Sequence, residues 1–500
     1  MNRKKSKFRT IANPAAVLLI LFLFSGAVNC PANRQDAETE ITIFHINDAH
    51  SRIDNFARIA YLIKKEKQEN PNVFFVNAGD NFSGNPIVDQ YEPKGEPMRA
   101  VLNLSGTDVL TLGNHEFDYG QELLKKFMQE ANFPIICANI AVPAGAIIPQ
   151  PKPYVILKTK EGIRIALLGL VQISRRTGIP STHPAKIKGL TFSYGVDTAK
   201  NYRFLKDKSD VFIALSHLGY MSDEKLAREM GELDIIIGGH SHTLMVNPVT
   251  INDVLITQAG SYARYIGRVD ITIKDGKITG KKSSLIKVED IKGEIPGIKE
   301  KITAFNNNPR LNRVLTTLPG PVKGEDLLGN LITDALRKIH HLDIGIHNRG
   351  GTRSGRLPKD VRLKDIYTLL PFGNDIVSIE MTPAEIEGIF RYDFERFNHV
   401  ELYVSGITYT VKHTAQKRFI SVDVRLMNGK PLDKNKTYKV GINDYLVSAY
   451  KFKHRDAGKS LDTTIAETFI QYLQQEKNVT EGLDEERIRT ALAGQKNKEK

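Results

Sequence analysis

The stretch ITIFHINDAH (41–50) sets a pattern that four later stretches repeat: VFFVNAGD (73–80), VLTLGNHE (109–116), VFIALSHLG (211–219) and IIIGGHSH (235–242). Each is an apolar run of the kind that forms a buried β-strand. Each also ends in side chains that bind metals. In open α/β sheets, sites form where the carboxyl ends of strands meet. We therefore expect five strand ends to converge on one site.

The converging side chains are imidazoles, carboxylates and one amide: Asp48, His50, Asp80, Asn114, His217, His240 and His242. This mixture suits borderline to hard divalent ions, and a shared carboxylate allows two of them. Taken singly, each stretch has an ordinary explanation, because Asn-Asp and Gly-Asp pairs are common in turns. The stretches recur in chain order and always at a strand end, and this favours a metal site.

The ordered set resembles the calcineurin-like metallophosphoesterases. The surrounding segments FHINDAHSRID (44–54), NAGDNFSG (77–84), LGNHEFDYG (112–120) and IIIGGHSHT (235–243) are similar to the bacterial 5′-nucleotidase family, which includes UDP-sugar hydrolases and cyclic-nucleotide phosphodiesterases. NRGGTRSG (348–355), YTLLPFGNDIV (367–377) and ELYVSGITYTV (401–411) are similar to that family's C-terminal domain. The resemblance extends from about residue 41 to about residue 480.

The resemblance implies two divalent ions, which we expect to be zinc, manganese or cobalt. Asp80 is expected to bridge them. Asp48, His50 and His242 would complete the ligands of one ion, and Asn114, His217 and His240 those of the other. Two such ions can hold a phosphoryl group and activate a water for attack on phosphorus.

The segment GNHEFD (113–118) supplies a second pair of side chains. In the family the equivalents of His115 and Asp118 form a catalytic dyad, because a carboxylate favours the protonated form of a neighbouring imidazole. An alternative role for Asp118 is to cap a helix that begins near Tyr119, and both roles are compatible. We expect Glu116 to be structural.

The resemblance also assigns substrate contacts to the second domain. Asn348, Gly350, Gly351 and Arg353 match a segment that contacts the substrate phosphate, and Phe372 and Tyr445 match two aromatic residues that stack on a base. Simple core packing is the alternative for both rings.

Two segments of the second domain depart from the family pattern. Gly324-Glu325 replaces an expected arginine, and Arg349 and Lys323 are candidates to supply the missing charge. Residues 448–452 replace an acidic sugar-binding motif.

Length and strand–helix alternation predict the domain organisation. A chain of 500 residues exceeds a single core. The fold class we expect is α/β, with an N-terminal two-sheet α/β/β/α metallophosphoesterase sandwich and a C-terminal mixed α+β nucleotide-binding domain. The predicted boundaries are a signal peptide at 1–29, a tether at 30–40, the sandwich at 41–290, a linker helix at 291–316, the substrate-binding domain at 317–480 and a charged tail at 481–500.

The N-terminus has the pattern of an export signal. The basic segment MNRKKSKFR (1–9) precedes the apolar AAVLLILFLFSGAV (15–28), and Cys30 follows. We expect a lipoprotein acylated at Cys30, exported to the periplasm or cell surface. The alternatives are a conventional signal peptide or a helical anchor. Without the five basic residues of 1–29, the net charge falls from +13 to +8. That modest, dispersed surplus suits anionic substrates and does not indicate a nucleic-acid polymer as partner.

The function predicted from these features is an exported two-metal phosphohydrolase acting on nucleoside 5′-phosphates. The enzymatic alternatives are a 2′,3′-cyclic-nucleotide phosphodiesterase with 3′-nucleotidase activity and a UDP-sugar hydrolase. A surface binding protein on a phosphatase scaffold is the non-enzymatic alternative. No protein partner is inferred. Because the metal motifs precede residue 290 and the substrate motifs follow residue 320, we expect domain closure or rotation about residues 297–316.

Overall fold

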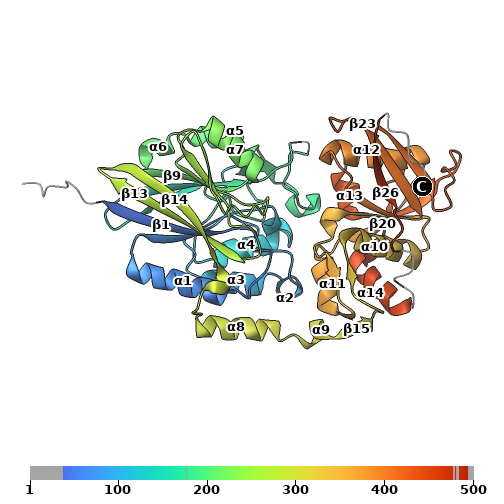
Figure 1. Cartoon of the computed structure of the whole chain (residues 1–500), viewed down its shortest axis with the longest axis horizontal. Helices are drawn as coiled ribbons and strands as arrows, with labels where there is room; N and C mark the ends of the chain where they lie inside the picture. The colour runs from blue at the N-terminus through green and yellow to red at the C-terminus, as the bar shows by residue number, and fades with distance from the viewer. Residues whose placement is uncertain (1–37, 176, 477–478, 480–482, 494–500) are drawn as a thin grey trace, which may run out of the picture.

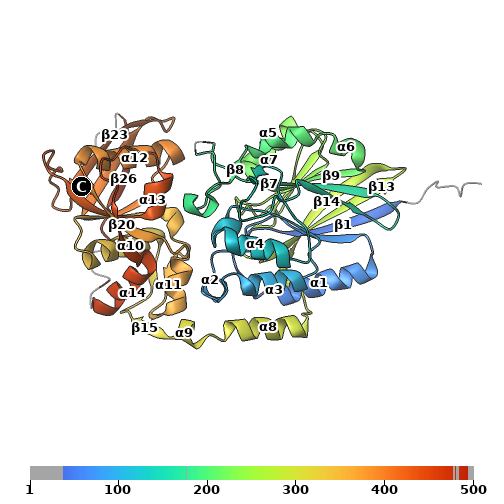
Figure 2. The same ribbon diagram turned by 180° about the vertical axis from the view of Figure 1, so that it is seen from behind.

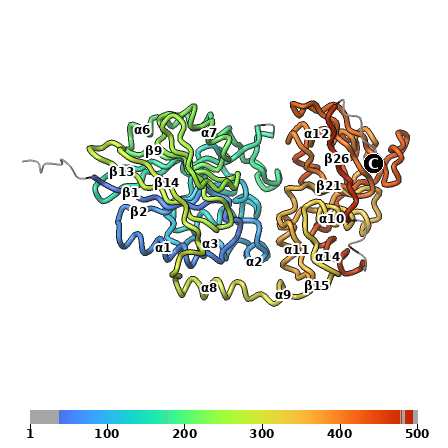
Figure 3. The backbone as a smooth tube through the Cα atoms, viewed as in Figure 1, coloured from blue at the N-terminus to red at the C-terminus, as the bar shows by residue number. Residues whose placement is uncertain are grey.

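The computed structural model describes residues 38–175, 177–476, 479 and 483–493. They form two domains that lie side by side, joined by a connector that runs along one edge of both (Figure 1). Figure 3 follows the chain through the N-terminal domain, along the connector and into the C-terminal domain. The proposed signal peptide and Cys30 lie outside the described residues.

The first sheet of the N-terminal domain has the strand order β14-β13-β1-β2-β3-β4. Its strands are β1 (Thr39–Ile46), β2 (Val73–Asn77), β3 (Val109–Thr111), β4 (Ile135–Ile136), β13 (Tyr265–Lys274) and β14 (Lys277–Lys287). The first four run parallel. Parallel pairing places the segments that follow β1, β2 and β3 at one edge of the sheet.

The second sheet has the order β11-β12-β10-β9-β7-β6. It contains β6 (Tyr154–Lys158), β7 (Arg164–Val171), β9 (Val211–His217), β10 (Ile235–Ile237), β11 (Val249–Ile251) and β12 (Val254–Thr257). Branched aliphatic residues of both sheets, including Ile43, Val76, Leu167 and Ile213, form the core between them. Strands buried on both faces explain the continuous apolar runs of the sequence.

Helices cover the outer faces of both sheets and complete an α/β/β/α sandwich (Figures 1 and 2). The first sheet packs on α1 (Phe56–Glu69), α3 (Glu96–Leu104) and α4 (Gln121–Glu130), and the second on α5 (Gly195–Ala199), α6 (Leu205–Lys208) and α7 (Tyr220–Glu229). The predicted α/β sandwich is confirmed.

The connector contains two short helices, α8 (Pro296–Asn306) and α9 (Pro309–Asn312), followed by β15 (Val314–Thr317). Helix α8 packs on the N-terminal domain through Ile298 and Ile302. Proline at the start of each helix favours the break between them, because it lacks an N–H to continue the preceding helix. The predicted linker helix is thus two helices.

The C-terminal domain contains a five-stranded sheet and a three-stranded sheet, with helices packed on both. The larger has the order β21-β17-β24-β20-β25, from β17 (Ile344–Asn348), β20 (Asp375–Met381), β21 (Leu402–Ser405), β24 (Tyr438–Asn443) and β25 (Lys459–Thr464). The helices are α10 (Glu325–Ile339), α11 (Leu363–Leu369), α12 (Pro383–Phe397), α13 (Asp444–Ala449) and α14 (Ile465–Gln475). The predicted mixed α+β domain is confirmed.

The charged segment after residue 480 differs from the prediction. Residues Ile488–Leu492 form β26, which pairs in parallel with β22 (Ile407–His413) in the order β23-β22-β26, where β23 is Phe419–Leu426. Arg487 is buried and pairs with Asp334 at 2.9 Å. The prediction assigned residues 481–500 to a charged tail, whereas Arg487 has a buried carboxylate as partner. The domain therefore extends to at least residue 492.

Across the described part of the chain, we find no helix with the length and apolar character needed to cross a membrane.

Candidate active site

The structure brings the seven predicted metal ligands together at the carboxyl edge of both sheets. Asp48 and His50 follow β1, Asp80 follows β2, Asn114 follows β3, His217 ends β9, and His240 and His242 follow β10. Ligand atoms of Asp48, His50 and His242 lie within 4.8 Å of one another, as do those of Asp80, His217 and His240. These two clusters correspond to the two halves of the expected ligand set.

Neighbouring donor atoms lie about as far apart as two ligands of one ion. The Nε2 atoms of His50 and His242 are 2.9 Å apart. His217 Nε2 lies 2.9 Å from Asp80 Oδ2, yet it is buried without an aligned hydrogen bond among the described residues. His240 Nδ1 lies 2.9 Å from Asn114 Oδ1. Lone pairs that face one another at this spacing fit a shared cation.

Hydrogen bonds to backbone carbonyls orient three of the ligands, His50, His217 and Asn114, for metal binding. His50 Nδ1 lies 3.0 Å from the carbonyl of Ser83, and His217 Nδ1 lies 2.6 Å from the carbonyl of Ala78. Each carbonyl fixes the proton on Nδ1 and leaves a lone pair on Nε2. The amide nitrogen of Asn114 donates to the Ser181 carbonyl at 3.0 Å, which turns its oxygen toward His240.

The charge of the cluster also fits bound cations. Asp48 and Asp80 are buried, and within the described residues their ion pairs involve only imidazoles. Burial by itself lowers the pKa of His217, but Asp80 and Asp48 raise that pKa to about 10. The cluster thus draws in a proton when no other cation is present. Buried carboxylates need a cationic partner, and these two pair with no lysine or arginine among the described residues. Divalent ions could supply that charge, and their binding would displace the proton.

Five ligands have left-handed backbone conformations, which non-glycine residues rarely adopt. Their φ angles are 51° for Asp48, 45° for His50, 58° for Asp80, 72° for His240 and 54° for His242. Each such residue costs on the order of 1–3 kcal/mol and persists only where its surroundings hold it. This concentration of strain at one sheet edge is typical of a functional site.

Glycines beside the ligands allow the strand ends to approach closely. A Cβ on Gly113 would meet the side chain of Asp80 and lie 2.6 Å from its backbone nitrogen. A Cβ on Gly239 would lie 2.8 Å from Nδ1 of His217. The glycines that precede Asn114 and His240 therefore fit the limited space between the strand ends as well as the geometry of the turns.

Glu116 organises the loops around Asp80. Its carboxylate accepts hydrogen bonds from the backbone nitrogens of Asp80 (2.9 Å), Asn81 (2.7 Å) and Gly113 (2.6 Å). These bonds tie the ends of β2 and β3 together, in agreement with the expected structural role.

His115 and Asp118 form a hydrogen-bonded pair next to the metal ligands. His115 Nδ1 lies 2.6 Å from Asp118 Oδ2, and Asp118 Oδ1 accepts a hydrogen bond from Thr182 Oγ1 at 2.7 Å. Burial lowers the pKa of His115, but Asp118 and Asp80 outweigh it, so the pKa is raised overall. Asp118 is not the N-cap of α4, which begins at Gln121 with Gly120 in that position.

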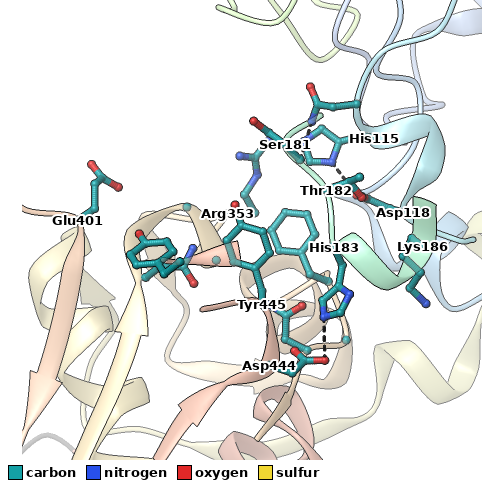
Figure 4. Close-up of a pocket in the computed structure, with 18 of the residues that line it drawn as sticks. His115, Asp118, Ser181, Thr182, His183, Lys186, Arg353, Glu401, Asp444 and Tyr445 are labelled. Carbon is teal, nitrogen blue, oxygen red and sulfur yellow. Dashed lines mark hydrogen bonds and ion pairs between the residues drawn. The ribbon is translucent and has the colours of Figure 1, made fainter. Parts of the chain in front are cut away.

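A cavity of about 550 Å³ lies between the two domains and reaches Asp80, Asn114 and His115. The predicted contacts of the second domain line its other wall: Asn348, Gly350, Gly351, Arg353, Phe372 and Tyr445. Figure 4 shows Arg353 and Tyr445 in the C-terminal domain facing His115 and Asp118 in the N-terminal domain. Phe372 and Tyr445 thus line the cavity and are not simply core residues.

Arg353 is a cationic side chain of this wall that acts on the dyad. Its guanidinium lies 5.7 Å from the ring of Phe372, and it acts electrostatically on His50 and His115. By contrast, Arg349 pairs with Asp326 at 2.6 Å, and neither Arg349 nor Lys323 lines the cavity. The expectation that one of them replaces the missing arginine was therefore wrong, because the acids of α10 hold Arg349.

Several residues of the site had no signal in the sequence. Ser181 and Thr182 hold Asn114 and Asp118 from a loop more than sixty positions away. From the same loop, His183 forms an ion pair with Asp444 of the other domain at 3.2 Å (Figure 4). No motif marks these residues, because their role depends on the tertiary path of the loop.

Comparisons with known proteins agree with this geometry. Residues 41–244 match the family model of the calcineurin-like phosphoesterases, and residues 310–451 match that of the 5′-nucleotidase C-terminal domain. The chain therefore belongs to the 5′-nucleotidase family of metallophosphoesterases, a family of hydrolases.

Two relatives and one solved structure illustrate the similarity. The chain is 28% identical to bovine 5′-nucleotidase, over 87% of this chain and 88% of that protein. It is 26% identical to the trifunctional nucleotide phosphoesterase protein YfkN of Bacillus subtilis over 94% of this chain, but it spans only 36% of that longer protein. The crystal structure of a 5′-nucleotidase precursor from Thermus thermophilus matches with a TM-score of 0.76 and 25% identity, over 90% of this chain and 99% of that one.

Proposed function

We propose that this protein is an exported, two-metal nucleotide phosphohydrolase that releases phosphate from nucleoside 5′-phosphates. One observation carries the proposal. A single cavity has the metal-ligand cluster and His115 on one wall, and Arg353, Phe372 and Tyr445 on the other. An aromatic pair suits a nucleobase, since stacking accepts any base, and a guanidinium suits a phosphate.

In the proposed reaction, the ligand set described above would hold two ions, with Asp80 shared between them. Such ions supply Lewis acidity and lower the pKa of a water that then serves as nucleophile. Arg353 holds the phosphoryl oxygens by charge-assisted hydrogen bonds. Asn348, whose side-chain oxygen accepts from Asn443 at 2.9 Å, presents its amide from a fixed position beside Gly350 and Gly351.

His115 is the proposed group that stabilises charge on the transferring phosphoryl or protonates the leaving oxygen. Its pKa is raised, and Asp118 accepts the proton on Nδ1, so that Nε2 remains available to the substrate. The cleaved bond is the one between phosphorus and the ester oxygen. The products are inorganic phosphate and a nucleoside.

The proposal requires both domains to act on one substrate molecule. Phe372 stacks on His115, and Asp444 pairs with His183, so the described conformation brings the two walls together. We propose that the domains separate or rotate about residues 297–316 to admit substrate and release product.

A panel of substrates tests the function. Purified protein with Mn²⁺ or Zn²⁺ is assayed for phosphate release from 5′-, 3′- and 2′,3′-cyclic nucleotides and from UDP-glucose. We expect the highest kcat/KM on 5′-monophosphates. A preference for cyclic and 3′-nucleotides or for UDP-glucose would select one of the two enzymatic alternatives. Metal binding without any phosphate release would select the binding protein.

We also propose that the protein is anchored through a lipid on Cys30, which lies outside the described residues. The support is the basic and apolar segment that precedes this cysteine. Cys30→Ser should move the protein from the membrane fraction to the soluble fraction, because the several acyl chains of a bacterial lipoprotein anchor stably whereas a single chain binds only marginally. Continued membrane association of this variant would exclude the lipid anchor.

A further inference from the structure

The cavity contains a second guanidinium that the proposed reaction does not use. Arg396, in the last turn of α12, lines the cavity together with Phe397, Tyr450 and Glu401. In Figure 4, Glu401 lies on the opposite side of the view from His115, with Arg353 and Tyr445 between them. Arg396 thus lines the same cavity as Arg353 and Tyr445.

Aromatic rings hold this guanidinium, and no carboxylate pairs with it among the described residues. The carbon Cζ of Arg396 lies 4.8 Å from the ring of Phe397 and 5.1 Å from that of Tyr450. Within the described part of the chain, its Nη1 atom is shielded from solvent and makes no hydrogen bond. By contrast, Arg391, one turn earlier on the same helix, pairs with Glu395 at 2.9 Å.

The acids around Arg396 already have other partners. The Tyr450 hydroxyl donates to Asp393 Oδ1 at 3.0 Å, and Asp393 Oδ2 accepts the backbone N–H of Glu401 at 2.7 Å. The carboxylate of Glu401 lies 2.6 Å from Nε2 of His399. This network fixes the Tyr450 ring beneath the guanidinium. A half-buried cation held in place by rings is prepared for an anion that arrives with a ligand.

The position of Tyr450 indicates where that anion lies on the substrate. Tyr450 follows the end of α13, five residues after Tyr445 in sequence, and both rings line the cavity. The sugar links the scissile phosphate at Arg353 to the base against Tyr445, so we place it beside this segment. Its 2′ and 3′ oxygens are the positions that can carry a further anionic group.

We propose that Arg396, supported by Phe397 and Tyr450, forms a subsite for a second phosphate on the sugar of the substrate. This inference rests on the proposed nucleotidase function. The substrate class is nucleoside 5′-phosphates that carry another phosphate on the 2′ or 3′ oxygen. Water attacks the 5′ phosphorus, the bond from phosphorus to O5′ breaks, and O5′ takes up a proton. Inorganic phosphate and a nucleoside 2′- or 3′-phosphate leave, and the phosphate at Arg396 is unchanged.

The test compares adenosine 5′-monophosphate with adenosine 2′,5′- and 3′,5′-bisphosphate, using the full chain with Mn²⁺. We expect at least one bisphosphate to be hydrolysed with a kcat/KM about tenfold or more above that of the monophosphate, the order expected for a charge-assisted hydrogen bond. Arg396→Gln should lower this ratio about tenfold. Arg391→Gln, the matched control on the same helix, should leave the ratio unchanged. UDP-glucose is included as a comparison, because its second phosphate is linked through a pyrophosphate and not through the 2′ or 3′ oxygen of the sugar.

A ratio that is the same in the wild-type protein and in Arg396→Gln would overturn the subsite. So would a dependence on Arg396 that appears with UDP-glucose and not with a bisphosphate. A second readout does not need nucleotide hydrolysis: inhibition of aryl-phosphate hydrolysis by adenosine 2′- and 3′-monophosphate. Arg396→Gln should raise the inhibition constant of one of them about tenfold. If nucleotides are not hydrolysed but this shift is found, the proposed function fails and the subsite stands; if neither inhibition constant shifts, the subsite is overturned.

Discussion

The ring of Phe372, in the C-terminal domain, stacks on the imidazole of His115, in the N-terminal domain, with centroids 5.7 Å apart and planes inclined by 13°. One residue belongs to the proposed base-binding pair and the other to the proposed catalytic dyad. Their contact places the proposed binding and the proposed chemistry on two different domains. Substitutions in one domain should therefore have effects that differ in kind from substitutions in the other.

Arg353→Ala and Phe372→Ala should reduce activity on nucleotides more than activity on an activated aryl phosphate. Loss of base stacking costs about 1–3 kcal/mol, which corresponds to a fall of about 5- to 150-fold in kcat/KM on nucleotides. The aryl phosphate has a better leaving group and needs less positioning. Steady-state kinetics with both substrates provide the measurement. An equal loss on both would make the second domain a structural support.

His115→Ala should lower turnover by about 10²–10⁴, the usual contribution of a general acid–base group. The bound metal, measured by elemental analysis, should remain near the wild-type level, because the sequence and the hydrogen bond to Asp118 assign His115 to the dyad. Its ring also lies within 4.8 Å of ligand atoms of His50 and Asp80. Loss of metal in this variant would therefore show that His115 is a ligand.

Gly113→Ala should lower both metal content and activity, because the added Cβ would displace Asp80. We expect a loss of about 100-fold or more in kcat/KM, as small displacements of reacting groups cost on that order. Gly231→Ala is the matched control, since a Cβ at that position meets nothing within 4 Å. Wild-type activity in Gly113→Ala would mean that the loop containing Asp80 can shift without consequence.

His45 should make the fold sensitive to acid. Burial lowers its pKa from 6.5 to about 3, and its two ring nitrogens have no hydrogen-bond partner among the described residues. The folded pKa lies below the unfolded one, so the neutral ring's contribution is complete above about pH 6.5 and is lost as the pH falls toward about 3. Lowering the pH from about 7 to about 4 should therefore cost on the order of 3 kcal/mol through this residue.

His45→Leu removes the titrating group and should flatten that pH dependence. Urea unfolding of chelator-treated wild-type and variant proteins at both pH values isolates the contribution, because all other groups are shared. The variant should lose less free energy of unfolding in acid than the wild type. Parallel losses in the two proteins would show that His45 does not titrate within this range.

The sequence was sufficient for the sandwich and for the position of the metal cluster. Helix α1, Phe56–Glu69, follows from apolar residues at helical spacing in the sequence. Asp80 and His217 were expected to meet because parallel strands end at one edge, and they do. These features follow from local periodicity and sheet geometry, and both can be read along the chain.

Other features depend on contacts that the sequence does not reveal. Arg487 was assigned to a charged tail, but Asp334 provides a buried partner 153 positions away. Arg349 was a candidate for phosphate binding, but Asp326 holds it outside the cavity. Thr182 and Arg396 had no motif at all. In each case the partner of a charged or polar group, rather than the group itself, determines its role.

The central claim, a metal-dependent phosphohydrolase in which Asp80 serves both ions, is tested most directly by Asp80→Ala. Metal content and phosphate release from adenosine 5′-monophosphate are measured after chelation and reconstitution with Mn²⁺, with His50→Ala alongside. We predict that the wild-type protein regains activity, that Asp80→Ala retains neither ion, and that His50→Ala loses mainly one. Full activity of the chelated wild-type protein, or loss of the same single ion in both variants, would contradict the account.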